Sequence, residues 1–468
     1  MKKISKQQEQ DFIKKCLKLD SIIYHRKTTI WPLREIFKLQ DYKRAIKNFI
    51  KQTIFFFKGR ENLPKNKLKI LICPDGGIGD IVLSRLFVYK LKNILPNSFI
   101  SVAFKNKKIL QMLFENQNLA DLITTNAYKK DYDLVYSGVR LFTFEIKNIN
   151  RIAKFAPEFL HYLKRVSELQ KAFKVFKNTP VAIEYPLIRL ILDLGLNVRE
   201  ANLWLNGFDD FETEFPPYML SLAEEKKILK KFALNGKKYI TIHDGFDANL
   251  ANLGTRNHKC WPKENWLDFI KLFKQSFPNI IIVQLGATNS VFFEGVDISL
   301  INKTDLPELP YILKNSLLHI DGESGIVHLN TILRNISLVM IGPTVLKYFA
   351  YKENINVLSR FCGQCVNIKN TLQRTCMLDK KIDCMTSILP QRVFIAAKRF
   401  LEGMPVCEIL NLDLKENPYS SKYKNNLKTL QDICEENLPY AKIGYNFGPE
   451  KITHKIIDFI SKKSDKFF

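Results

Sequence analysis

The sequence predicts an α/β protein with two parallel-sheet domains, and three observations support this class. Short apolar, strand-like runs alternate with amphipathic helical segments in both halves of the chain. In each half, one such run leads through a glycine-containing turn into a helix, at residues 71–83 and at residues 317–333. The segment Phe215–Pro217 is typical of a linker between the two series. Open α/β sheets bind ligands at strand–turn–helix junctions, so two facing junctions would form a two-domain cleft enzyme.

In the first half, the expected elements alternate as the strands and helices of a parallel sheet do. The expected strands are Lys69–Cys73, Phe99–Phe104 and Asp133–Tyr136, and the expected helices are Asp80–Leu95, Lys108–Glu115 and Pro180–Leu196. Residues 139–178 are rich in basic side chains and are expected to be mostly helical.

The same alternation recurs in the second half. The expected strands are Tyr239–His243, Asn279–Leu285, Leu317–Ile320 and Ile336–Ile341, and the expected helices are Lys263–Phe277, Glu308–Asn315, Gly325–Leu333 and Pro390–Leu401. The chain is therefore expected to have four parts. These are a basic helical extension at 1–65, a first α/β domain at 66–212, a second at 213–389 with a cysteine-rich finger at 361–385, and a helix and tail at 390–468.

The composition indicates a largely globular chain, since 46% of its 468 residues are hydrophobic. No run approaches the roughly 18 apolar residues that a membrane span needs. The basic start leads into no apolar signal-peptide core. Nine cysteines without a secretion signal are typical of a reducing compartment, so a cytoplasmic protein is expected.

The net charge is +25, and residues 1–67 alone carry +12 of it. A field of that sign attracts nucleic acid, acidic lipid headgroups or phosphorylated substrates. A lysine-rich composition alone would not explain the N-terminal bias. Residues 45–57 form an amphipathic pattern that fits a helix on an anionic membrane surface or an ordinary helix packed on a core. The sequence shows no basic platform with interleaved aromatic residues, which argues against a nucleic-acid partner.

Asp80 is the first candidate functional residue. It follows a turn that contains Gly76, Gly77 and Gly79, and it stands at the start of the first expected helix. A carboxylate in this position can cap backbone amides. It can also act as a general base that takes the proton of an attacking hydroxyl, and both roles stay open at this point.

Two further segments suit an anionic ligand. Thr255 offers a hydroxyl and Arg256 and Lys259 offer cations, which is typical of phosphate binding or of a solvated basic loop. Downstream, if a helix begins near Gly325, its N–H groups and positive dipole end would hold a pyrophosphate. His328 would then lie one turn into that helix, where it could bind a phosphate or sugar oxygen or simply pack.

The fourth candidate is a group of cysteines. Cys362, Cys365, Cys376 and Cys384 have a spacing that suits a tetrahedral thiolate site for zinc or iron. Because the protein would supply all four ligands, such a metal would be structural rather than catalytic. Reduced, unligated thiols are the alternative.

Four motifs together resemble glycosyltransferase family 9, the ADP-heptose:lipopolysaccharide heptosyltransferases. They are Ile78–Asp80 with an apolar helix and Leu95–Asn97, Thr255 with Lys259–Pro262, Glu323–Leu329 with Ile341–Thr344, and Cys362–Cys365 with Cys384–Ile388. The resemblance extends over residues 68–400. It implies a GT-B architecture, in which two Rossmann-like domains face a cleft, and an inverting transfer from a nucleotide-diphospho-sugar without a catalytic metal.

The resemblance also implies roles for single residues. Asp80 matches the family's general base, and the first α/β domain would bind the acceptor. The residues that match the family's donor contacts are Thr255, Lys259, Glu323, Gly325, Ile326 and His328. Arg256 and Ser324 lie in the same segments and are also candidates for donor binding. The chain departs from the family where it has Glu323 instead of a common Asp, and where Asp244 replaces a common Pro before Gly245.

The resemblance further implies ADP-heptose as the default donor and a cell-envelope glycan or lipid-linked acceptor, as in lipopolysaccharide biosynthesis. Such an enzyme would work in the cytoplasm and bind peripherally to the inner face of the inner membrane, whose anionic surface attracts basic residues. Two alternatives remain open. One is a transferase that glycosylates a protein, and the other is a non-catalytic nucleotide-sugar-binding or membrane-surface adaptor.

Overall fold

The structure is a computed structural model, and it describes residues 4–11, 14, 62–139, 142–171, 191–192, 194–208, 214–245, 259–365, 376, 378, 383–426 and 428. The amphipathic pattern at 45–57, most of Pro180–Leu196, and Thr255 and Arg256 lie outside these residues. The chain divides into two compact units. Unit 1 is Met1–Ile183 with Asp193–Pro216, and unit 2 is Glu184–Leu192 with Pro217–Phe468.

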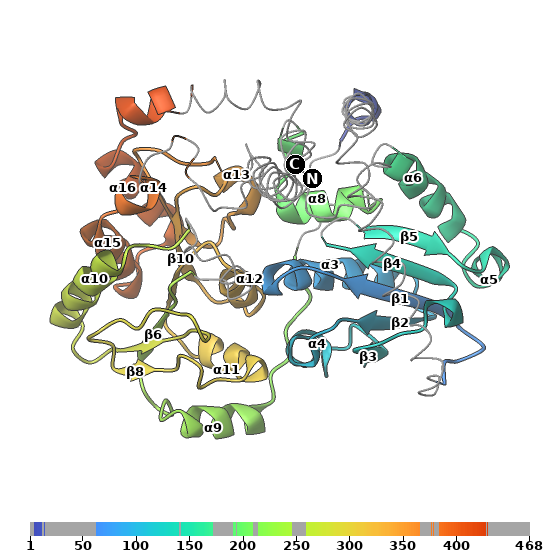
Figure 1. Cartoon of the computed structure of the whole chain (residues 1–468), viewed down its shortest axis with the longest axis horizontal. Helices are drawn as coiled ribbons and strands as arrows, with labels where there is room; N and C mark the ends of the chain where they lie inside the picture. The colour runs from blue at the N-terminus through green and yellow to red at the C-terminus, as the bar shows by residue number, and fades with distance from the viewer. Residues whose placement is uncertain are drawn as a thin grey trace, which may run out of the picture. The chain divides into compact units, whose positions relative to one another are not determined.

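Unit 1 contains a five-stranded sheet in the order β3-β2-β1-β4-β5 (Figure 1, blue to teal). Its strands are β1 (Leu68–Pro74), β2 (Ser98–Ala103), β3 (Leu122–Thr124), β4 (Leu134–Gly138) and β5 (Phe142–Ile146). The first four are parallel, and β5 runs antiparallel to β4. The helices of this unit are α3 (Ile78–Ile94), α4 (Lys107–Phe114), η1 (Lys129–Asp131), α5 (Ile149–Phe155), α6 (Phe159–Lys171) and α8 (Val198–Leu205).

The expectation that residues 139–178 are mostly helical is wrong for β5. Phe142, Thr143, Phe144 and Ile146 are aromatic or β-branched residues, which favour a pleated strand. The strand pairs with β4 over its whole length, with Glu145 opposite Val135. Most of the basic residues that suggested helix follow this strand, and α5 and α6 do form there.

Unit 2 contains a six-stranded parallel sheet in the order β11-β10-β9-β6-β7-β8. Its strands are β6 (Tyr239–Ile242), β7 (Ile281–Gln284), β8 (Ile298–Ser299), β9 (His319–Gly322), β10 (Ser337–Ile341) and β11 (Ile355–Leu358). Its helices are α9 (Leu222–Lys231), α10 (Lys263–Ser276), η4 (Leu306–Glu308), α11 (Leu309–Lys314), α12 (Gly325–Ile332), α13 (Leu346–Phe349), α14 (Asp383–Thr386), α15 (Pro390–Leu401) and α16 (Val406–Glu416). Counted within the unit, the strand order is 3-2-1-4-5-6, which is the Rossmann order.

The core of unit 2 lies between this sheet and the neighbouring helices α10 and α15 (Figure 1). Trp261, Trp266 and Phe269 are buried in it, and the indole N–H of Trp261 donates to the carbonyl of Ile388 at 2.8 Å. This bond ties the start of α10 to the segment before α15. The core therefore fixes the residues that come immediately before α10 and α15.

A second anchor fixes the last described helices of unit 2. Asp413 of α16 is buried and accepts hydrogen bonds from Arg392 of α15 at 2.5 and 2.7 Å. Arg360, which follows β11, also donates to this carboxylate at 3.0 Å, as does the amide of Asn417 at 3.0 Å. A buried carboxylate between two guanidinium groups is a strongly coupled unit.

Both sheets reverse their order of strand addition at one point. In unit 1 this switch lies between β1 and β4, and in unit 2 it lies between β6 and β9. Ligands in open α/β folds bind outside the carboxyl ends of the strands at such points. The predicted GT-B α/β fold class is confirmed for the two units, each considered by itself. Within the described ranges, no helix is both long enough and apolar enough to cross a bilayer.

Candidate functional site

The glycine-rich turn of unit 1 follows β1 at the switch point. The backbone N–H of Asp75 donates to the carbonyl of Gly138 at the end of β4, at 2.8 Å, which joins the two central strand ends. Gly76 has a φ of +108°, which side chains other than glycine rarely adopt. A Cβ at this position would lie 2.4 Å from Oδ2 of Asp80. The turn therefore requires glycine in order to make room for the Asp80 carboxylate.

Asp80 is the third residue of α3 and is half-buried. Its Oδ2 accepts a hydrogen bond from the backbone N–H of Gly77 at 2.9 Å, so Asp80 caps the start of the helix. A carboxylate can accept several hydrogen bonds. The cap is therefore compatible with a role as general base, which stays a prediction.

The corresponding switch point of unit 2 brings Lys259 and Glu323 together. The ammonium of Lys259, which precedes α10, forms an ion pair with the carboxylate of Glu323, which follows β9. The two side chains are only 12% and 7% exposed. The hydroxyl of Thr344, after β10, lies 3.5 Å from the same carboxylate. Three strand ends thus contribute to one polar cluster.

Glu323 is negatively charged in this cluster at neutral pH. Burial opposes its ionisation, but the charge of Lys259 and the hydrogen bond and charge of His328 hold the pKa of Glu323 well below its ordinary value. Nε2 of His328 lies 3.3 Å from the Glu323 carboxylate. The sequence-predicted residues Lys259, Glu323 and His328 are therefore in mutual contact.

Tyr351 is a member of the cluster that the sequence did not indicate. Its hydroxyl lies 2.5 Å from Nδ1 of His328, and the two rings meet edge to face with centroids 5.3 Å apart. Tyr351 lies between α13 and β11, outside the four motifs. Together with Glu323 it fixes both ring nitrogens of His328, so that this histidine has a defined orientation.

The helix α12 begins beside this cluster. Ser324 is its N-cap residue, and the Ser324 hydroxyl accepts the backbone N–H of Ile326 at 3.2 Å. Gly325 and Ile326, in the first turn, are half-buried. A Cβ on Gly322, just before the cap, would lie 2.8 Å from the carbonyl oxygen of Lys259. The glycine thus permits the backbone of Lys259 to approach the chain just before α12 closely.

The four cysteines of the predicted metal site are all present as thiols. Burial and the neighbouring Cys362 and Cys376 raise the pKa of Cys365 to about 12. Burial and the other three cysteines, Cys365 first, hold the pKa of Cys384 well above its ordinary value. The four sulfurs therefore lie within electrostatic reach of one another. Among the residues that the structure describes, no three cysteine, histidine or carboxylate side chains are placed to hold one metal ion. A bound metal at these cysteines stays a prediction.

No protein-family model matches the chain. The chain is similar to lipopolysaccharide heptosyltransferase 1 of Campylobacter coli, with 26% identity over 363 residues, which cover 69% of this chain and 95% of that protein.

Solved structures are also similar. Escherichia coli ADP-heptose lipopolysaccharide heptosyltransferase II is 13% identical with a TM-score of 0.43, and the alignment covers 75% of this chain and 99% of the other. A glycosyltransferase family 9 protein of Veillonella parvula is 14% identical with a TM-score of 0.45, covering 73% and 99%. The iron-containing dodecameric glycosyltransferase TibC of enterotoxigenic E. coli is 14% identical with a TM-score of 0.47, covering 73% and 79%.

The alignment with the Campylobacter protein covers more than two thirds of this chain. The resemblance that the motifs predicted is thereby confirmed: the chain is similar to the heptosyltransferases of glycosyltransferase family 9.

Proposed function

We propose that the protein transfers a sugar, with inversion, from a nucleotide-diphospho-sugar to a hydroxyl of a cell-envelope acceptor. The observation that carries this proposal is the arrangement at the switch point of unit 2, where Lys259 pairs with Glu323, two residues before the first turn of α12. A lysine ammonium and the N–H groups of a helix start are both typical ligands of a diphosphate. ADP-heptose is the proposed donor, because the similar Campylobacter protein is a lipopolysaccharide heptosyltransferase.

In the proposed reaction, the acceptor oxygen attacks the anomeric carbon while the bond from that carbon to the diphosphate oxygen breaks. The electron pair leaves with the nucleoside diphosphate, and Asp80 takes the proton of the acceptor hydroxyl. Lys259 and the first turn of α12 stabilise the charge that grows on the leaving diphosphate. Preorganised donors of this kind are worth about 3 kcal/mol each in a transition state.

The remaining donor contacts are assigned to the same cluster. Glu323 would accept a hydrogen bond from a hydroxyl of the sugar. His328, whose Nδ1 is held by Tyr351, would exchange Glu323 for a donor oxygen at Nε2. Thr255 and Arg256 are proposed as further phosphate contacts on sequence grounds. None of these steps requires a catalytic metal.

The acceptor is proposed to be a glycan or lipid-linked molecule at the inner face of the inner membrane. The support is indirect, since the excess of basic residues at 1–67 would favour binding to an anionic surface. We further propose that Cys362, Cys365, Cys376 and Cys384 hold a structural zinc or iron ion. Elemental analysis of the purified protein, with a Cys365→Ser and Cys384→Ser variant as control, tests that assignment.

The function is tested by incubating the purified full-length chain with ADP-heptose and a heptose-free lipopolysaccharide core. We expect release of ADP that depends on the acceptor, and we expect UDP-glucose to give much less product. Failure of the folded protein to release ADP would contradict the proposed donor. Equal ADP release with and without acceptor would contradict the transfer.

A further inference from the structure

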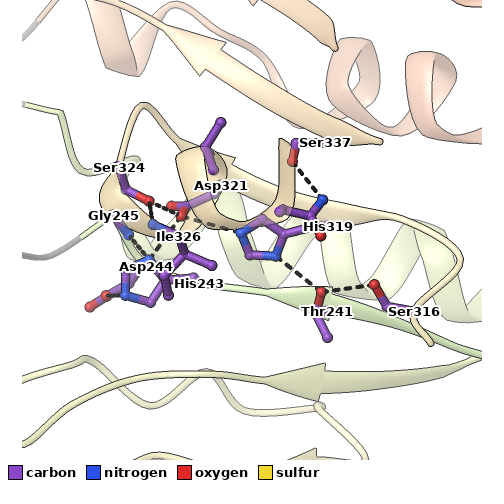
Figure 2. A network of polar contacts seen from close by, with 12 residues as sticks. Thr241, His243, Asp244, Gly245, Ser316, His319, Asp321, Ser324, Ile326 and Ser337 are labelled. Carbon is purple, nitrogen blue, oxygen red and sulfur yellow. Dashed lines mark hydrogen bonds and ion pairs between the residues drawn. The ribbon is translucent and has the colours of Figure 1, made fainter. Parts of the chain in front are cut away.

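A buried polar network lies directly behind the start of α12 (Figure 2). Its centre is Asp321, which is 0% exposed and belongs to β9. Oδ2 of Asp321 lies 3.0 Å from Nδ1 of His243 and 3.4 Å from Nε2 of His319. The same oxygen accepts the hydroxyl of Ser324 at 2.5 Å. One carboxylate oxygen thus joins two histidines to the N-cap residue of the helix.

The network is anchored on both sides by groups that are themselves buried. Nδ1 of His319 lies 3.0 Å from the hydroxyl of Thr241, which in turn lies 3.4 Å from the hydroxyl of Ser316. On the other side, Nε2 of His243 lies 3.6 Å from Asp244, whose carboxylate accepts the backbone N–H of Val291 at 2.9 Å. The side chains of Asp321 and both histidines are therefore held in place.

The hydroxyl of Ser324 both donates and accepts a hydrogen bond. It donates its single hydrogen to Asp321 and accepts the backbone N–H of Ile326. Because the hydroxyl hydrogen of Ser324 is used in the bond to Asp321, the side-chain rotamer of Ser324 is fixed. The position of this N-cap residue at the start of α12 is fixed with it. The first turn of α12, whose N–H groups have no partner within the helix, is then held at a defined place at the switch point.

We propose that Asp321 is a positioning residue for donor binding, which acts on the donor through Ser324 by fixing the first turn of α12. This inference rests on the proposed function, because it assumes that the diphosphate binds at that turn. Asp321 touches neither the proposed donor site nor the reacting atoms directly.

The two histidines make the buried Asp321 carboxylate compatible with an anionic donor bound at the start of α12. A negative charge behind the helix start would stabilise the helix dipole but repel an anionic diphosphate. His243 and His319 lie against the carboxylate and can compensate its charge. Although burial opposes ionisation, the charge of His243 and the hydrogen bonds from both histidines lower the pKa of Asp321. The carboxylate is therefore ionised and able to accept the Ser324 hydroxyl.

A purely structural role is the competing explanation. His319 pairs with Thr241 across β9 and β6, so the network also links these two strands. Loss of Asp321 would then lower the stability of unit 2 without a specific effect on the donor. The two explanations differ in whether affinity for the donor depends on the bond between Asp321 and Ser324.

The test uses the full-length chain and ADP as the probe. The variants are Asp321→Asn, Ser324→Ala, their combination, and Ser324→Thr, which keeps the hydroxyl. The matched control is Asp413→Asn, which alters another buried carboxylate of unit 2 that accepts hydrogen bonds from three side chains. Dissociation constants are measured by calorimetry well below the unfolding temperature of each variant.

We expect Ser324→Ala to weaken ADP binding about tenfold, as the loss of a helix cap would. Asp321→Asn should weaken it less, because an amide oxygen still accepts the Ser324 hydroxyl but without the charge that strengthens the bond. The double variant should be no weaker than Ser324→Ala alone, because both changes act on one linkage. Ser324→Thr should bind nearly as wild type does. Asp413→Asn should unfold at a lower temperature and bind ADP normally.

Three results would overturn the inference. They are unchanged ADP affinity in Asp321→Asn, additive losses in the double variant, or an equal loss of affinity in Asp413→Asn. If Asp321→Asn does not fold, the pair Ser324→Ala and Ser324→Thr decides, and equal affinities in these two would overturn it. A wild-type protein that binds no nucleotide would instead refute the proposed function, and the positioning role with it.

Discussion

The two strand–turn–helix junctions of this chain have the same topology and opposite electrostatics. After β1, the turn leads to Asp80, a half-buried carboxylate inside the first turn of α3 that accepts a backbone N–H. After β9, Glu323 precedes its helix, is buried, and is neutralised by Lys259. The first junction thus presents a carboxylate, whereas the second pairs its carboxylate with a cation. One fold element can therefore serve proton removal in one unit and anion binding in the other.

The largest effect is expected for Asp80→Asn. An amide keeps the shape of the side chain but cannot accept a proton at neutral pH, so kcat should fall by about 10³-fold, within the range for loss of a general base. Donor affinity should stay within about twofold of wild type, since the change lies in the other unit. Measurement of kcat and of the ADP dissociation constant checks both parts, and near-normal turnover would exclude Asp80 as the base.

A smaller effect is expected for Gly76→Ala. The added Cβ would collide with Oδ2 of Asp80, and φ at this position is +108°. We expect a loss of stability of about 1–3 kcal/mol from backbone strain, with kcat about tenfold lower because the carboxylate is displaced. Urea unfolding and turnover are the measurements.

The matched control for Gly76→Ala is Gly403→Ala. Gly403 has a φ of +94°, but an added Cβ would meet no atom within 4 Å. This variant should lose stability through strain alone and keep its kcat. If both variants lost kcat equally, the contact with Asp80 would not be the reason that residue 76 is a glycine.

A moderate change of opposite sign is expected for Glu323→Gln. Removal of the negative charge beside Lys259 should raise the affinity for ADP, which is itself an anion, by about fivefold. Transfer should nevertheless slow, because the proposed contact with the sugar is weakened. Calorimetry with ADP together with the KM for ADP-heptose distinguishes the two effects, and weaker ADP binding would show that Glu323 supports the diphosphate site rather than opposing it.

The smallest effect is expected from pH. The pKa values of Glu323 and Asp321 are lower in the folded chain than their ordinary values of 4.5 and 3.8. Each carboxylate therefore stabilises the fold above these ordinary values, and that contribution is lost as the pH falls through the folded pKa. Urea unfolding between pH 6 and pH 3 should show falling stability, and Glu323→Gln should flatten the curve. Glu294→Gln is the control: Lys263 also lowers the pKa of Glu294, but this pair is exposed and screened by water, so its replacement should change the slope much less.

The parts of the fold that local patterns control were predictable from sequence. The helix Pro390–Leu401 has the predicted ends, because a proline starts it and its apolar face repeats with helical spacing. Both glycine-containing junctions also lie where the sequence placed them. By contrast, β5 and β11 were missed, since short strands at or near a sheet edge depend on pairing with a neighbour.

In the candidate site, too, residues in local motifs were predictable and residues brought in by tertiary contacts were not. Lys259, Glu323 and His328 were predicted from residue type and motif, and the structure brings them together. Tyr351 and Asp321 were not predicted, because Tyr351 meets His328 from outside the motifs and Asp321 meets His243 from a distant part of the sequence. The pairing of Thr241 with His319 across β6 and β9 creates the buried network, and no local spacing indicates it.

The measurement that tests the central claim most directly is a calorimetric titration of the full-length chain with ADP, GDP, UDP and CMP, repeated for Lys259→Ala and Asp80→Asn. The claim is that the first junction removes a proton and the second binds the diphosphate. It predicts saturable binding of one nucleotide, loss of that binding in Lys259→Ala, and its retention in Asp80→Asn. Binding of no nucleotide by the folded wild-type chain, or equal loss in both variants, would contradict it.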